Sequence, residues 1–240
     1  MKSSLRLTLI IVLFTAVLAM AQTAPAPSAQ KSSGDGDRNS VLVKMNANAG
    51  DFKSAQADFD LETYESIVKE KTLQKGRIYF RRMGKGEVQA AFHITSPAPK
   101  QVVFKDSKIY MLESNINQLT IRDVSSNKAD VEAFLSLGFG ARGDDLKKDY
   151  DVTLAGWEPV DGVRTAKLEL VPHKEKLRQT YNKIILWIDP ERNVLLQQQF
   201  MEPSGNYRLT RYTNLKLNSK ISDEAFRLKT TDKTRTVTTQ

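Results

Sequence analysis

The sequence of 240 residues contains no cysteine. The chain therefore forms no disulfide bond, offers no thiol for catalysis and cannot carry a lipid on a cysteine. Only two histidines are present, His93 and His173, and they do not have the spacing of a metal-binding pair. We interpret each as a surface histidine, because neither has neighbours in the sequence that would make it a catalytic base.

Catalytic motifs are lacking as well. The glycines Gly138 and Gly140 are not followed by the terminal Lys-Ser/Thr of a phosphate-binding loop, and no serine lies in a Gly-x-Ser-x-Gly turn. The adjacent carboxylates Asp144 and Asp145 are more typical of the start of a helix than of an acid–base pair. The sequence thus predicts no catalytic residue, no metal site and no cofactor, and a β-rich enzyme ranks third among the functional hypotheses.

The one long hydrophobic run lies at the N-terminus. Lys2 and Arg6 precede the apolar residues 7–18, and Ala19-Met-Ala21 follows as an A-x-A cleavage site. The run is too short to cross a bilayer about 30 Å thick as a helix. We predict a cleavable signal peptide (1–21), cleavage after Ala21 and, for a cysteine-free exported chain, localisation in a bacterial periplasm.

Composition divides the rest of the chain. Residues 22–38 are rich in Ala, Pro, Ser, Gln and Gly and predict a flexible linker, residues 39–229 have the size of one domain, and residues 230–240 are a Thr-rich flexible tail. Loss of Lys2 and Arg6 with the signal peptide, two positive charges, would lower the formal charge from +8 to +6. Export argues against nucleic acid as a partner. An attraction to anionic lipid headgroups and an ordinary solvated basic surface both remain open.

Apolar and polar side chains alternate between Gln74 and Arg122, and the pattern returns after residue 150. This alternation predicts strands with one apolar face. The connections are too short for parallel crossovers, so we expect a single antiparallel sheet coiled into a barrel or half-barrel. The predicted strands, about eleven, are 56–64, 77–82, 88–95, 101–105, 108–113, 118–123, 150–156, 163–171, 183–188, 194–201 and 207–217.

Helical spacing interrupts the strands in three places. A short helix is expected to start at Asn39 or Ser40 and to end at Gly50, and one more helical turn is expected over 144–148. Between them Asn127 is a candidate N-cap for an apolar helix closed by Gly138. This apolar helix lies between strands in the sequence, so we expect it to cover an apolar surface of the protein.

Several modest motifs, in this order, resemble the periplasmic outer-membrane lipoprotein carrier family, the LolA-type fold. The resemblance covers about residues 41–226. It is carried by Gly76-Arg-Ile-Tyr-Phe-Arg-Arg82, Gln101-Val-Val-Phe-Lys-Asp-Ser-Lys-Ile-Tyr110, Asn117-Gln118, Leu168-Glu-Leu-Val-Pro172, Ile184-Ile-Leu-Trp-Ile-Asp189 and the stretch from Gly205 to Phe226. Met83 departs from the family, which typically has proline after the basic pair, and the tail lacks the usual Pro-Gly ending.

The resemblance implies an incomplete antiparallel β-barrel, mainly β within the α+β class, whose concave apolar face is covered by a helical lid. It implies a monomeric carrier that shields the acyl chains of lipoproteins or a related lipid. An inner-membrane export complex would load it and an outer-membrane acceptor would unload it. A sensor of lipid or lipoprotein on the same fold, without transport, is the alternative.

The strand alternation and the resemblance together name candidate site residues. Arg82 matches the second arginine of the family's basic pair, which implies a latch between barrel and lid, although a rim arginine that interacts with water fits equally well. The apolar candidates would line a cargo cavity, but the same alternation is expected of ordinary core. They are Phe59, Leu61, Ile78, Phe80, Phe92, Ile94, Tyr110 and Leu112 on strands and Phe134, Leu137 and Phe139 on the lid.

Overall fold

The computed structural model describes residues 33–84, 87–137 and 139–239. The predicted signal peptide, linker residues 22–32 and the helix-closing Gly138 lie outside the described residues. Residues 33–38 of the predicted linker belong to the first helix, which begins earlier than expected. The helices are α1 (Ser33–Ala49), α2 (Lys128–Ser136), α3 (Gly143–Asp149) and α4 (Glu175–Thr180), with 3-10 turns η2 (Ser114–Ile116), η3 (Ser125–Asn127) and η4 (Asp223–Phe226).

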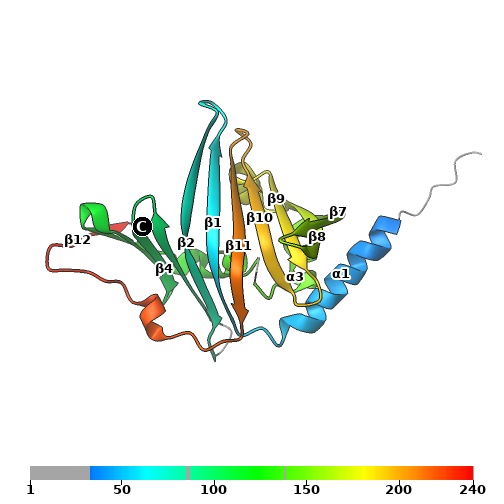
Figure 1. Ribbon diagram of the computed structural model, residues 1–240, viewed down its shortest axis with the longest axis horizontal. Coiled ribbons are helices and arrows are strands. Elements are labelled where there is room, and N and C mark those ends of the chain that lie inside the picture. The colour runs from blue at the N-terminus through cyan, green and yellow to red at the C-terminus, as the bar shows by residue number, and fades with distance from the viewer. Residues whose placement is uncertain (1–32, 85–86, 138, 240) are drawn as a thin grey trace, which may run out of the picture. The chain divides into compact units, whose positions relative to one another are not determined.

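Each of the eleven predicted strands is present, several of them longer than expected, and a twelfth follows near the C-terminus (Figure 1). The strands are β1 (Ser54–Glu65), β2 (Glu70–Arg82), β3 (Val88–Ser96), β4 (Lys100–Lys105), β5 (Lys108–Glu113), β6 (Gln118–Asp123), β7 (Tyr150–Val160), β8 (Val163–Pro172), β9 (Lys183–Asp189), β10 (Val194–Met201), β11 (Tyr207–Leu217) and β12 (Arg235–Thr239).

These strands form one sheet in the order β12-β6-β5-β4-β3-β2-β1-β11-β10-β9-β8-β7. Two meanders, β1 to β6 and β7 to β11, are joined by the antiparallel pairing of β1 with β11. The outermost strands β12 and β7 do not pair, so the sheet does not close. The expected incomplete antiparallel barrel is therefore confirmed, with one parallel pair added where β12 lies beside β6.

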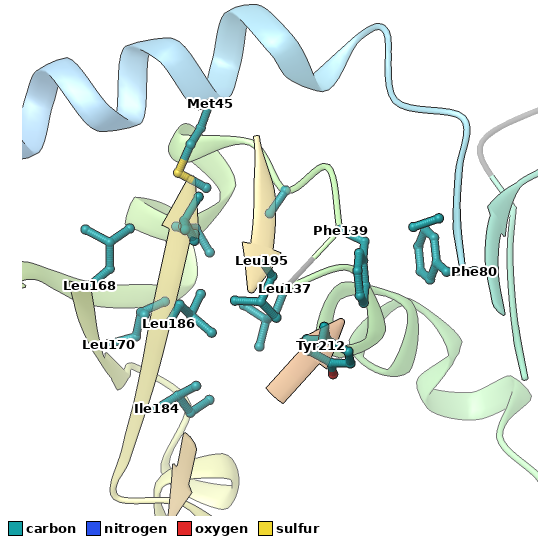
Figure 2. Close-up of a cluster of buried hydrophobic side chains, with 14 of the residues drawn as sticks. Met45, Phe80, Leu137, Phe139, Leu168, Leu170, Ile184, Leu186, Leu195 and Tyr212 are labelled. Carbon is teal, nitrogen blue, oxygen red and sulfur yellow. The ribbon is translucent and has the colours of Figure 1, made fainter. Parts of the chain in front are cut away.

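The main core lies on one face of the sheet. It unites buried residues of β1–β4, such as Phe80, with residues of β7–β11, such as Leu186, in a single cluster. Strands so far apart in the sheet contribute to one cluster only because the sheet curls around it, and we call this the concave face. Figure 2 shows Met45 of α1 pointing into the same cluster, and Phe139, from the segment after α2, packing between Phe80 and Tyr212.

The segments that cover the concave face pack closely against one another at two glycines. Gly140 has a positive φ of 67°, and a Cβ atom there would lie 2.4 Å from the Phe52 ring. A Cβ atom on Gly143, at the start of α3, would lie 2.4 Å from the carbonyl oxygen of Leu42 in α1. Glycine thus allows the α2–α3 connection to pack on the Phe52 ring at Gly140 and the start of α3 to pack against the backbone of α1 at Gly143.

A C-terminal strap, residues 219–229, crosses the opposite, convex face of β2 to β4. Its Ile221 and Phe226 are buried against Ala91 and Val103. The chain then continues to β12 at the edge of β6. The Thr-rich composition of residues 230–240 predicts a flexible tail, yet residues 235–239 of this segment pair with β6. Its β-branched residues suit an edge strand that needs no buried face.

Candidate functional site

Nine of the eleven apolar candidates lie at the concave face or its cover. Phe59, Ile78, Phe80, Leu137 and Phe139 are buried in the main core, and Leu61, Phe92, Ile94 and Phe134 are partly buried against it. The five buried residues form packed core. The four partly buried ones mark where the apolar face is incompletely covered.

Tyr110 and Leu112 lie on the other face of the sheet. Tyr110 packs against the convex cluster beneath the strap, and Leu112, two residues along the same strand, shares its side. The error has a simple cause. The run from Ile109 to Leu112 is apolar at every position, so alternation could not tell which residues of β5 face inward.

The cover of the concave face has a firm part and a loose part. α3 contributes the buried Leu146 and packs with α1, whose Leu42 and Met45 belong to the core. α2 has no buried residue at all. Its Val131, Phe134 and Leu135 are only partly buried against the main core, the ring centroid of Phe134 lies 5.1 Å from that of Phe200, and surface ion pairs add to these contacts.

The ion pairs at α2 contribute little. Lys174 lies 2.5 Å from Asp130, and Lys128 lies 3.2 Å from Glu87, all four side chains being accessible to solvent. Exposed pairs of this kind typically contribute about 0.2–1 kcal/mol each. A helix held so weakly belongs to the part of a structure that opens at low free-energy cost.

A cavity of about 230 Å³ opens between α2 and α4. Ala133, Phe134 and Leu177 give it apolar walls, and Asp130 and Lys174 are among its polar lining residues. Tyr150 also lines it, and burial raises the pKa of this phenol to about 12, so the hydroxyl stays protonated and able to donate a hydrogen bond. The charged loop between β8 and β9 gave no sign of α4 in the sequence.

Arg82 joins the sheet to the end of α1 and to the connection between α2 and α3. Its Nη1 donates to the carbonyl oxygen of Ala49 at the end of α1 (3.1 Å), and its Nη2 donates to that of Gly140 (2.7 Å). Burial lowers the pKa of Arg82, against the opposing effect of Asp145. Arg82 thus contacts carbonyl oxygens of the cover, and its role as a latch stays a prediction.

Asn193, which the sequence analysis did not single out, makes a second connection of the same kind. Its side-chain amide donates to the carbonyl oxygens of Met45 (3.1 Å) and Ala141 (3.4 Å). The residue is buried in the β9–β10 turn with a positive φ of 50°, where asparagine is favoured for its backbone alone. Its sequence context therefore indicates a turn and nothing more.

Neither histidine lies at the concave face. His93 is on the convex side, where its Nε2 lies 2.8 Å from the carbonyl oxygen of Ala225 in the strap. His173 contacts Asp151, which raises the pKa of this exposed histidine. Among the described residues, no group of three or more His, Asp or Glu side chains has the arrangement of a metal site.

The protein is expected to lose stability in acid because of His93. Burial lowers the pKa of His93, so the unfolded chain takes up a proton first once the pH falls below about 6.5, and stability decreases. Urea unfolding at about pH 7.5 and about pH 5.5 should show a smaller acid loss for His93→Gln than for the unchanged protein. His173 has a raised pKa and so acts in the opposite sense, but it is present in both proteins, and its contribution drops out of the comparison. Equal acid losses would contradict the prediction.

Comparison with known proteins gives this architecture a family. The sequence model of the outer membrane lipoprotein carrier protein LolA matches residues 50–229. The chain belongs to the LolA family. The match spans β1 to the end of the strap, and so includes the concave face, α2 and α3 of its cover, and Arg82, whereas α1 precedes it. No curated protein sequence matches the chain.

Solved structures similar to this LolA-family chain agree on the fold. A crystal structure of MucB is 17% identical with a TM-score of 0.53, over 82% of this chain and 64% of MucB. An uncharacterized conserved protein from Thermus thermophilus is 12% identical with a TM-score of 0.52, over 85% of this chain and 99% of that protein. The chain thus spans less than two thirds of the MucB chain. Likeness at these identities concerns the fold alone.

None of the described helices is both long and apolar enough to serve as a transmembrane segment.

Proposed function

We propose that this protein is a periplasmic carrier that holds the acyl chains of lipoproteins, or of a related lipid, on its concave face beneath α2. The observation that carries the proposal is the contrast within the cover. α1 and α3 are anchored by buried side chains, whereas α2 has none, and the apolar residues Leu61, Phe92 and Ile94 of the sheet are only partly buried. LolA-family membership supports the same reading.

In this proposal α2 moves to admit the cargo. The cavity between α2 and α4, at about 230 Å³, is smaller than the roughly 300–1,000 Å³ usual for ligand pockets, and we therefore take the described conformation as the closed one. Each methylene withdrawn from water contributes about 0.8 kcal/mol. Acyl chains therefore supply a driving force for displacing a helix that has no fully buried side chain.

In this proposal the exported protein receives its cargo from an inner-membrane complex and passes it to an outer-membrane acceptor. A sensor that binds the same lipid without transport would use the same site. The fold likeness to MucB does not separate the two functions, since it concerns the fold alone. Isolation of the partners would separate them: lipid-export machinery supports the carrier, and a signalling receptor supports the sensor.

The binding step is tested with the purified protein and a fluorescent fatty acid. We expect saturable binding, and co-purifying lipid or acylated protein in a native mass spectrum of protein isolated from the periplasm. Phe134→Ala removes the main apolar anchor of α2 and part of the cavity wall, and should change the affinity with little effect on the unfolding midpoint. An apo mass together with no binding of the probe would exclude the proposal.

A further inference from the structure

The β1–β2 hairpin ends in a turn of unusual composition. Residues 66–69, which we call the tip, are Ser-Ile-Val-Lys, and the side chains of Ile67 and Val68 are 91% and 60% exposed. Turns of this kind normally carry Gly, Asn, Asp or Pro, because these residues accept the required backbone angles. Here Lys69 takes a positive φ of 57°. Residues that are unfavourable in a turn and do not stabilise the folded state are expected at functional sites.

The tip is held from the neighbouring β10–β11 turn. The backbone N–H of Ser66 donates to Asn206 Oδ1 (2.8 Å), and the Ser66 hydroxyl donates to the carbonyl oxygen of Ser204 (2.8 Å). Asn206 Nδ2 in turn donates to Glu65 (2.8 Å). These bonds hold the turn without help from Ile67 and Val68, whose apolar side chains are left exposed.

Side chains typical of a membrane interface lie just behind the tip. The rings of Tyr64 and Tyr207, paired across β1 and β11, stack with centroids 5.1 Å apart, and Lys71 Nζ lies 5.9 Å from the Tyr207 centroid. Tyrosine is enriched where bilayers meet water, and lysine there keeps its charged end among the headgroups. Figure 1 shows the β1–β2 hairpin extending past the adjacent strands.

We propose that the tip inserts into the headgroup region of a lipid bilayer and docks the protein there. Two side chains on a convex turn are too few for a specific protein interface, which buries about 800 Å² per partner, whereas a fluid bilayer needs no complementary shape. The charges of Glu65, Lys69, Glu70 and Lys71 cancel. Insertion is therefore driven by apolar burial and depends little on salt. The inference rests on the proposed function, because it places the carrier where lipid cargo enters or leaves.

The absence of cysteine permits a direct test. A polarity-sensitive fluorophore is attached to Ile67→Cys and, as the matched control, to Ile116→Cys, an exposed isoleucine in η2. With vesicles of phosphatidylethanolamine and phosphatidylglycerol, the label at position 67 should shift to the blue and be quenched by spin-labelled lipid. The label at position 116 should do neither. Equal responses at both positions, or none at position 67, would overturn the proposal.

Sedimentation with the same vesicles tests the unlabelled side chains. The double variant Ile67→Asp, Val68→Asp should bind about tenfold or more weakly, whereas Ile116→Asp should bind like the parent protein. The proposal that the tip docks on lipid would be overturned if the double variant bound the vesicles as well as the parent protein does. It would also be overturned if the variant lost vesicle binding only when the vesicles contain a membrane protein. Binding of the fluorescent fatty acid in solution is followed in parallel. Its absence counts against the carrier function, whereas tip-dependent vesicle binding supports docking by itself.

Discussion

Replacement of Arg82 by leucine is expected to leave the protein folded and to increase the fraction that retains acyl cargo. The substitution removes two hydrogen bonds that join the sheet to Ala49 and Gly140. Bonds to charged groups contribute about 1.5–3 kcal/mol. Because these bonds belong to the closed cover, their loss shifts the equilibrium toward the open, cargo-holding form, by about tenfold for each 1.4 kcal/mol.

The change is measured as the dissociation rate of the fluorescent fatty acid, and as the proportion of loaded protein in a native mass spectrum. Asn193→Gly, which removes the second connection but tolerates the positive φ, should act in the same direction with a smaller effect, since its bonds are between neutral groups.

Arg81→Leu is the matched control for Arg82. Arg81 precedes Arg82 in β2 but faces the strap, where it pairs with Asp223 and lies 4.3 Å from the Phe226 ring centroid. Its loss should loosen the strap without altering cargo release. The latch fails as an explanation if Arg82→Leu loads and releases like the unchanged protein, or if Arg81→Leu reproduces its effect.

Phe80→Asp is expected to unfold most of the protein. The ring is 1% exposed and packs between those of Phe52 and Phe139, at centroid distances of 5.7 and 5.9 Å. Truncation of such a ring to alanine already costs about 3–5 kcal/mol. An unpaired buried carboxylate adds to that cost, and whole domains have only about 5–15 kcal/mol of stability.

Urea unfolding followed by tryptophan fluorescence checks this result. The paired variant Phe134→Ala, in the loosely held α2, should unfold near the parent midpoint and change mainly acyl binding. The comparison decides between core and cargo lining for Phe80. If Phe80→Asp stays folded and loses only the binding of fatty acid, the ring belongs to the cargo surface.

The alternation of side chains was enough to predict the strands of both meanders, since each has a clear turn on either side. It could not orient β5, where Ile109 to Leu112 are all apolar, and so misplaced Tyr110 and Leu112. It also missed β12, because an edge strand carries no buried face and leaves no apolar pattern. Alternation records which side chains are buried on one face of a strand. It does not record how a strand such as β5 or β12 pairs with its neighbours.

Arg82 was predicted because a family motif marks it and because alternation places it at the end of β2. Asn193 forms a connection of the same geometry, yet its position in a turn explains its presence without any contact. The loose attachment of α2 was equally hidden, since its apolar spacing resembles that of a packed helix. Such features depend on distances between segments far apart in the chain, which a single sequence does not record.

The pairing of β1 with β11 has a consequence for how the protein is made. All other strand pairs within the two meanders join neighbours along the chain, but this ladder joins the first strand to one that is synthesised more than a hundred residues later. Non-local pairing of this kind is slow, because a long loop must close before any contact repays its entropy. The nascent chain consequently stays without its central ladder until β11 has been made, so the complete sheet can form only late in synthesis.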